Sequence, residues 1–369
     1  MFRIIVFFNV PFASAVVSHG AAKYIQSGSN SAAMPLLKTA FFKFKRAMRK
    51  SIQTKCFTGC ALVMLVALSC ITRNNPFDPV NQPAAHTGGA TVVADKDTLM
   101  KSIFAATAGD TIALAAGTYP VSLRFGNSGT AARPIVVRGY DSNSIVQAQP
   151  GLGILYISGQ NSIRFSQIVF DSSFASGVKI ENGSSDIAFD NCIFRNNDFD
   201  GLEITDSDVR VTNCMFLRNT KAGIRISGDA TARYAVTADN VLCAHNLQEG
   251  VAIIAAPASL AHSTISDNGA SGIAITSPAG AVRVVYSIIS FNLGAGVSGQ
   301  WDSTAARITL DSLDIFSNQQ PLVLVPAVSP AYWTGDPMFA DRGADNYSIG
   351  PASEIYSMEQ LGIIIGFRR

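Results

Sequence analysis

The chain has 369 residues, of which 28 are Lys or Arg and 26 are Asp or Glu, for a formal net charge of +2. The first 73 residues hold ten basic residues and no acidic ones, so the remainder carries 28 − 10 = 18 basic against 26 acidic residues, a net charge of −8. This acidic body argues against nucleic acid as a partner, because phosphate binding needs clustered positive charge.

Two stretches near the N-terminus have the pattern of an export signal. Met1 to Ala15 joins one Arg to an apolar run and an A-x-A site. The stretch 48–70 has three basic residues followed by FTGCALVMLVAL, an apolar run too short to span a bilayer. We favour the second stretch, with Met48 as the true start and residues 1–47 as an over-extended reading frame. The alternative is a genuine basic leader followed by an internal anchor.

The second stretch ends in ALSC, which resembles the lipobox of bacterial lipoproteins. The resemblance implies that Cys70 is lipidated and becomes the mature N-terminus. It departs from the usual motif at Ala67, where Leu is commonest, and at Leu68, where a small residue is expected. Residues 71–89 contain three prolines and little apolar material, as expected of a flexible tether. We therefore expect an exported lipoprotein, at the outer membrane, the cell surface or facing the periplasm, that touches the membrane through its lipid alone.

A short helix is predicted just after the tether. Asp97 and Thr98 offer an N-cap, and Leu99, Ile103 and Ala106 follow at helical spacing. We interpret this helix as a cap on the open end of the repeats that follow, which would otherwise expose apolar core to water.

An Asn-x-x-x-Gly step then recurs through the body of the chain. The intervals between successive Asn residues are 22, 27, 22, 24 and 26. Each repeat carries three short stretches of apolar alternation, which read as strands with one buried face. Such strands can bury their faces only by coiling, with a climb of roughly 4.8 Å per turn. Stacked Asn amides would then form a hydrogen-bonded ladder, and the Gly would permit a positive φ or a close backbone approach. The ladder residues are Asn197, Asn219, Asn246, Asn268, Asn292 and Asn318.

This pattern resembles the right-handed parallel β-helix superfamily, whose pectate-lyase-like members show the same N-x-x-x-G-(I/V/L)-x-(I/V) coils. The resemblance implies an all-β fold: a single-stranded right-handed parallel β-helix, or solenoid, over residues 90–366, with the short capping helix at its N-terminal end. We expect a monomer. The fold by itself does not define an activity.

Cysteine and histidine offer little chemistry. Cys192 and Cys214 occupy the same inward slot on adjacent coils and are predicted to be buried apolar fillers, with a disulfide between them as the alternative. No C-x-x-C pair or His cluster indicates zinc. His245 and His262 are predicted to lie at corners of the coils.

The outward strand face after each Gly carries the strongest candidate site. It places Lys179, Glu203 and Arg225 one above another. In β-helix polysaccharide lyases and epimerases this kind of face forms the sugar groove, so the resemblance implies that Lys179 or Arg225 takes an α-proton. It also implies that a cation or Ca²⁺ neutralises the uronate carboxylate. The acidic side chains nearby that would hold Ca²⁺ are Glu181, Asp198 and Asp200.

The simpler interpretation of that face is an alternating-charge ladder that keeps the surface soluble. The later coils present Ala252, Ile254 and Ala274 there, a poor floor for a long polar groove. The chain also lacks the paired-aspartate and Gly-His-Gly signatures of pectin hydrolases and the Asp-Pro-His-Glu motif of alginate epimerases.

Three functional hypotheses follow. We favour binding of cell-surface or extracellular polysaccharide, with or without processing. The second is a lyase or uronate epimerase, and the third is a non-catalytic adhesive or structural envelope protein. Phe199, Tyr234 and Trp301 are candidate exposed aromatic residues for binding sugar, although Phe and Tyr inside such coils are more often part of the core.

Overall fold

The computed structural model describes residues 17–18, 21–22, 90–140, 143–229, 233–300, 308–325, 332–355 and 365–368. The chain divides into two units, residues 1–85 and 86–369. In the first unit the described residues form one antiparallel pair, β1 (Val17–Ser18) with β2 (Ala21–Ala22). The predicted signal stretch 48–70 with Cys70, the tether and Trp301 lie outside the described residues.

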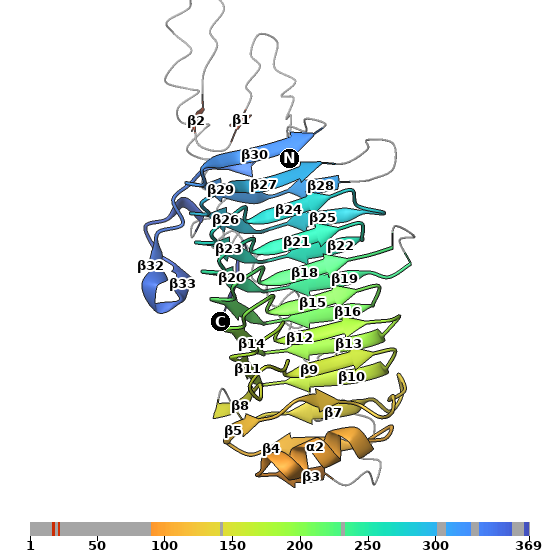
Figure 1. Cartoon of the computed structure of the whole chain (residues 1–369). Coiled ribbons are helices and arrows are strands. Elements are labelled where there is room, and N and C mark those ends of the chain that lie inside the picture. Colours follow the sequence, from red (N-terminus) through yellow and green to blue (C-terminus); the bar gives the residue numbers. More distant parts are fainter. Residues whose placement is uncertain are drawn as a thin grey trace, which may run out of the picture. The chain divides into compact units, whose positions relative to one another are not determined.

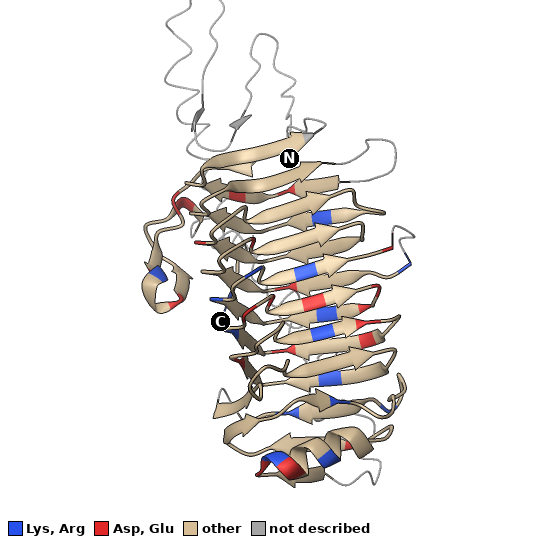
Figure 2. Ribbon diagram, viewed as in Figure 1, with Lys and Arg blue, Asp and Glu red and all other residues tan. Residues whose placement is uncertain are grey.

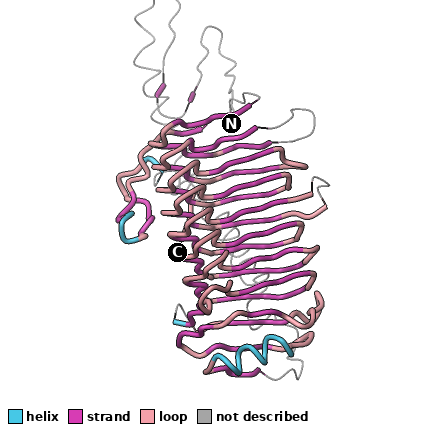
Figure 3. The backbone as a smooth tube through the Cα atoms, viewed as in Figure 1, coloured by secondary structure: helices cyan, strands magenta, loops and turns pink. Residues whose placement is uncertain are grey.

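The second unit is built from short strands that stack into three parallel sheets, as Figures 1 and 3 show. Each coil contributes one strand to each sheet, and each strand pairs in parallel with its counterparts on the coils before and after. Sheet I has ten strands: β3 (Ala90–Val93), β4 (Thr111–Leu114), β7 (Ile135–Arg138), β10 (Asn161–Ser166), β13 (Ser185–Asp190), β16 (Val209–Thr212), β19 (Val236–Asp239), β22 (Ala258–Ala261), β25 (Val282–Val285) and β28 (Ile308–Asp311).

Sheets II and III complete the three sides of the coil. Sheet II has ten strands: β5 (Gly117–Pro120), β8 (Ser144–Gln147), β11 (Val169–Asp171), β14 (Ile193–Arg195), β17 (Met215–Leu217), β20 (Leu242–Ala244), β23 (Thr264–Ser266), β26 (Ile288–Ser290), β29 (Leu313–Phe316) and β31 (Tyr332–Trp333). Sheet III has nine: β6 (Leu123–Arg124), β9 (Leu155–Ser158), β12 (Val178–Glu181), β15 (Leu202–Thr205), β18 (Ile224–Ser227), β21 (Val251–Ile254), β24 (Ile273–Thr276), β27 (Ala295–Gln300) and β30 (Gln320–Val325). The predicted parallel β-helix is confirmed.

The interior of the coils is filled by stacks of like residues. Phe194 lies in register between Phe170 and Phe216, with ring centroids 5.0 and 4.7 Å away, respectively. Cys192 and Cys214 are free and fully buried, so they fill the core as thiols and do not form the alternative disulfide. The core is one continuous column because every coil buries its inward residues against the next.

The predicted Asn ladder is confirmed. In each step one side-chain amide donates from Nδ2 to Oδ1 of the next Asn, over 2.8 to 2.9 Å. Each Oδ1 also accepts the backbone N–H of the preceding Asn, as Asn246 does from Asn219 at 3.1 Å. The Gly in the motif is needed for close approach, since a Cβ on Gly201 would lie 2.7 Å from the carbonyl oxygen of Gly223. The ladder thus holds adjacent corners together with buried, satisfied amides.

The N-terminal end of the solenoid is covered by α2 (Lys96–Ala105). Its Leu99 and Ile103 are fully buried in the core, as predicted for a cap. The N-cap residue is Asp95 and not the predicted Asp97–Thr98 pair, because the Asp95 carboxylate accepts the backbone N–H groups of both of those residues.

After β31 the chain leaves the coils and packs on the outside of sheet II. We call described residues 334–355 and 365–368 the C-terminal segment. It contains β32 (Phe339–Asp341), the 3-10 helix η2 (Arg342–Ala344) and β33 (Asn346–Ile349), beside sheet II in Figure 1. Its Tyr347 and Phe367 pack on Met215, Leu217, Leu242 and Ala244, and its Ile349, Ile355 and Ile365 pack on Ile288.

Polar contacts hold the same segment in place. Arg218 of sheet II forms a bidentate ion pair with Asp345, at 2.6 and 2.9 Å. Arg342 reaches back to Asp267 at 2.6 Å, and Tyr347 donates to the same carboxylate at 2.8 Å. The outer face of sheet II is therefore covered by the chain itself from β17 to β26. Within the described residues, no helix is long and apolar enough to cross a membrane.

Candidate functional site

The outer face of sheet III carries the column of side chains that the sequence singles out. The strand register places Lys179 beside Glu203 and Glu203 beside Arg225. The column extends to Tyr156 and Arg124 on one side and to Ala252 and Ala274 on the other. Charged residues lie mostly on the middle coils, whereas the strands of the later coils carry few charges (Figure 2). The predicted stack of three charged residues is thus present.

Lys179 lies between two carboxylates. Its Nζ is 3.2 Å from Glu181 and 3.5 Å from Glu203, and all three side chains are partly exposed. The hydrogen bond to Glu181, together with the charge of Glu203, raises the pKa of the Lys179 ammonium above its ordinary value. A general base needs the opposite shift, toward the working pH. These contacts therefore favour a permanently charged lysine over one that accepts a proton.

Arg225 is paired with a buried carboxylate on the preceding coil. Its Nε donates to Asp200 at 3.0 Å, and the second oxygen of Asp200 accepts the backbone N–H of Ala222 at 2.9 Å. Burial raises the pKa of Asp200, although the hydrogen bond from Arg225 opposes that shift. Removing Arg225 would leave a buried carboxylate without its countercharge, so this pair belongs to the framework of the face.

The three acidic residues predicted to hold Ca²⁺ have separate surroundings. Asp198 is exposed, Asp200 has both oxygens engaged, and Glu181 contacts Lys179. Calcium takes about six to eight oxygen ligands at one point. In the part of the chain that the structure describes, no three His, Cys, Asp or Glu side chains are grouped to hold a metal ion. These residues do not fit a calcium site.

Two aromatic side chains border the charged column. Tyr156 carries the guanidinium of Arg124 at 4.7 Å from its ring centroid, and Phe199 carries the ammonium of Lys221 at 4.1 Å. Together with Lys179 they line a surface pocket of about 210 Å³, which Ala175, Ser176 and Glu203 complete. We call this the aromatic pocket. Phe199 is 42% exposed, which corresponds to the alternative and not to the core position that the sequence favours for it, and Tyr156 was missed. The signal for Tyr156 is its position in the outward column, where it pairs with Lys179 of the next strand.

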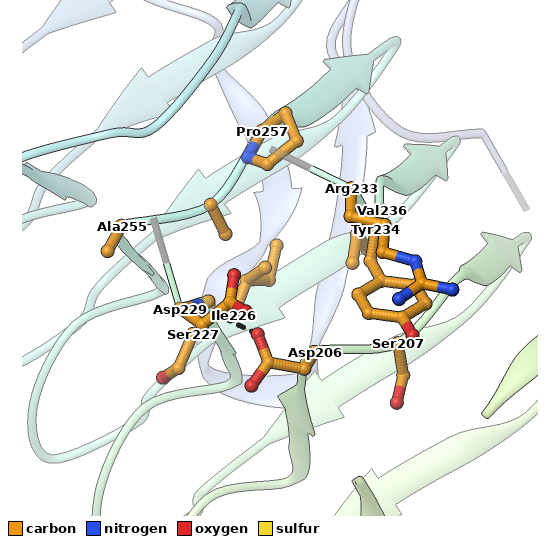
Figure 4. A pocket seen from close by; sticks show the side chains of 12 residues that line it. Asp206, Ser207, Ile226, Ser227, Asp229, Arg233, Tyr234, Val236, Ala255 and Pro257 are labelled. Carbon is orange, nitrogen blue, oxygen red and sulfur yellow. Dashed lines mark hydrogen bonds between the residues drawn. The ribbon is translucent and has the colours of Figure 1, made fainter. Parts of the chain in front are cut away.

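A second pocket lies at the corner between sheets III and I (Figure 4). It holds about 10 Å³, room for roughly one water molecule. Asp206 accepts the backbone N–H of Asp229 there, and Arg233 lies 5.3 Å from the ring of Tyr234. Tyr234 is half-buried in this corner and is not part of the aromatic pocket.

Both histidines lie at corners, as predicted, and both have positive φ. His262 contacts Asp239 at 2.7 Å and stacks on Tyr286. His245 lies 3.0 Å from the carbonyl oxygen of Arg342, at the contact with the C-terminal segment. Neither lies among the residues that line the aromatic pocket.

The comparisons with known proteins agree with this architecture. Residues 151–309 match the family model described as a right handed beta helix region. The three parallel sheets and this match together show a right-handed parallel β-helix fold. No curated protein matches the sequence.

Solved structures with a similar course of the chain include three enzymes. An alginate lyase from Paenibacillus sp. str. FPU-7 is 15% identical with a TM-score of 0.47, over 66% of this chain and 97% of the lyase. The pectate lyase Pel9A is 13% identical with a TM-score of 0.42, over 69% and 84%. The periplasmic alginate epimerase AlgG is 12% identical with a TM-score of 0.45, over 62% and 60%. Similarity at this level assigns no activity to this chain.

Proposed function

We propose that the protein is an exported, lipid-tethered β-helix protein that binds polysaccharide on the outer face of sheet III. The observation that carries the proposal is the aromatic pocket, in which Tyr156 and Phe199 flank a Lys179–Glu203 pair. Binding sites for small molecules and sugars join apolar and aromatic walls to a few fixed polar groups. The pocket lies on a regular strand face, so a linear polymer can continue past it along the solenoid axis.

Binding fits this face better than proton abstraction does. Lys179 has a raised pKa, and Arg225 is engaged by Asp200. Neither side chain is therefore prepared to take an α-proton. A β-elimination would be recognised by ultraviolet absorbance of the unsaturated product, and we expect no such rise with any uronate polymer.

The binding test uses the full chain, purified in detergent, and a panel of soluble polysaccharides in affinity electrophoresis or titration calorimetry. We expect Tyr156→Ala and Phe199→Ala each to weaken binding about tenfold, or about 1.4 kcal/mol. Phe104→Ala is the matched control, because Phe104 is 65% exposed on α2 and does not line the aromatic pocket. Failure to bind any polysaccharide would refute the proposal, and binding unaffected by both pocket variants would place the ligand elsewhere.

The tether is tested separately. Expressed in a bacterial host and labelled with palmitate, the chain should incorporate lipid and sediment with membranes, whereas Cys70→Ser should do neither. Cys56→Ser and Cys60→Ser are controls, since both residues precede the lipobox-like ALSC. Unchanged labelling in Cys70→Ser would refute lipidation at this residue without affecting the binding proposal.

A further inference from the structure

We infer that the aromatic pocket selects uncharged sugar units and discriminates against uronates. This inference rests on the proposed function, since it names the class of polysaccharide that the same site would take. It follows from the partners of the cationic groups, from the character of the ring faces, and from the residues along the rest of the column.

The cationic groups around the pocket already have partners. Lys179 contacts two carboxylates, at 3.2 and 3.5 Å, and Arg225 is held by the buried Asp200. The remaining two, Arg124 and Lys221, lie over the rings of Tyr156 and Phe199. A ligand carboxylate at Lys179 or Arg225 would have to compete with the carboxylates already paired there. A uronate that took Arg225 would leave the buried Asp200 carboxylate without its countercharge, since its other oxygen is bound to a neutral backbone N–H.

The charged side chains around the aromatic pocket also carry no net charge. Four basic residues are matched by four acidic ones. Glu203 and Glu181 are both partly exposed, so an approaching uronate meets like charge beside Lys179. Like charges placed together disfavour a complex by electrostatic repulsion. The four basic residues are Arg124, Lys179, Lys221 and Arg225, and the four acidic residues are Glu181, Asp198, Asp200 and Glu203.

The aromatic walls point to the same preference. The face of an aromatic ring carries negative electrostatic potential, so it attracts cations and C–H groups and repels a carboxylate. Tyr156 and Phe199 stand on coils two strand spacings apart, roughly 9.6 Å along the axis. A neutral sugar ring that stacks its nonpolar C–H face on these walls breaks no ion pair, although on the ring face held by Arg124 or Lys221 it takes the place of that cation.

The column beyond the pocket carries no further cations. After Arg225 the outward residues are Ala252, Ala274 and Ser298. A polyuronate has a carboxylate on every unit and would need a cation at each successive position. The neighbouring corner instead exposes apolar side chains: Leu152 at 46%, Phe174 at 49%, Phe199 at 42%, Leu247 at 67% and Leu293 at 73%. A neutral chain suits this surface, and a polyanion does not.

The test compares polygalacturonate with the same polymer after its carboxylates have been reduced to hydroxymethyl groups, so that backbone and linkage are identical. Binding to the full chain is measured by calorimetry at low and high salt. We expect the reduced polymer to bind at least about tenfold more tightly, with an affinity insensitive to salt. The double variant E181Q/E203Q frees Lys179 and should gain salt-sensitive binding to the uronate polymer.

The possible outcomes separate this inference from the proposed function. Tighter, salt-sensitive binding of polygalacturonate by the unmodified chain would overturn the inference and leave polysaccharide binding standing. If the chain binds neither these two polymers nor any other polysaccharide of the panel, both are overturned. E181Q/E203Q must retain the thermal stability of the parent chain, and retained stability without any gain in uronate binding would contradict the charge argument.

Discussion

The outer faces of sheets II and III are built from the same coils but have opposite surroundings. On sheet II the outward column includes Ile193, Met215, Leu242 and Ile288, and the C-terminal segment covers the last three of these. On sheet III the outward column is charged and aromatic over the first coils and remains uncovered by described residues. The type of residue at the outward position of each repeat therefore distinguishes a face that the chain covers from one that stays open.

The largest effect is expected from uncovering sheet II. A chain ending before Phe339 loses the contacts of Tyr347 and Phe367 with four apolar side chains of the sheet. At about 1.5 to 3 kcal/mol for each large apolar side chain returned to water, the loss is about 6 kcal/mol or more. Thermal denaturation and binding of a hydrophobic dye measure it. An unchanged melting temperature with no dye binding would contradict the covering role.

The next largest loss of stability is expected from the Asn ladder, at the corner that joins sheets II and III. Asn246→Ala removes the acceptor of Asn219 and the donor of Asn268, all within buried surroundings. Orphaned buried polar groups should cost about 3 kcal/mol in the free energy of unfolding, measured by chemical denaturation. Asn346→Ala is the control, because Asn346 is exposed, has no positive φ, and its side chain accepts a hydrogen bond from the backbone N–H of Ser348. Equal losses in the two variants would show that the ladder contributes nothing special.

Asp314 should make the stability of the folded chain depend on pH. It lies in β29 of sheet II, paired with Trp333, after which the C-terminal segment begins. It is fully buried, one oxygen accepts the N–H of Gly335, and the other has no hydrogen-bond partner. Burial, with the charges of Asp336 and Glu354, raises the pKa of Asp314 to about 7, from an ordinary value of 3.8. The folded chain thus holds a proton that the unfolded chain releases, so stability falls as pH rises from about 4 to about 7.

Asp314→Asn tests this dependence. The variant has no ionisable group at this position, so its stability relative to the parent should increase by about 4 kcal/mol from pH 4 to above pH 7. Denaturation of both proteins from pH 4 to 8 gives the difference directly. A difference that stays constant with pH would mean that Asp314 does not titrate in this range.

The smallest effect is expected on the open face of sheet III. Lys179→Met breaks two ion pairs between partly exposed side chains. Surface pairs of this kind contribute less than about 1 kcal/mol, so the melting temperature should barely change. A loss as large as that of Asn246→Ala would show that this face, too, is part of the framework.

The repeats made much of the fold predictable. Asn-x-x-x-Gly spacing fixes which residues stack, so the ladder and the column of Lys179, Glu203 and Arg225 follow directly from it. The pairing of Arg225 with Asp200 does not, because it joins two different positions of the repeat. The cation-ring contact of Lys221 with Phe199 joins the same position on adjacent coils, two residues after Asn219 and Asn197, so the spacing already placed these two side chains together.

The C-terminal segment was not predictable from periodicity, since a segment outside the repeats has no register with them. One signal was available in the coils. The strands before Asn219 and Asn246, Met215-Phe216-Leu217 and Leu242-Cys243-Ala244, are apolar on both faces, and a strand of that kind is buried on both sides. What covers its outer side depends on long-range packing that a single sequence does not reveal.

The Asn ladder has a further consequence for how such a protein changes in length. All five side-chain bonds point the same way along the axis, and each involves only the next coil. A whole coil inserted in register would extend the row by one amide and leave every other bond intact. Length is therefore a modular property of this architecture, and the open face of sheet III can be lengthened or shortened one coil at a time without redesign of the core.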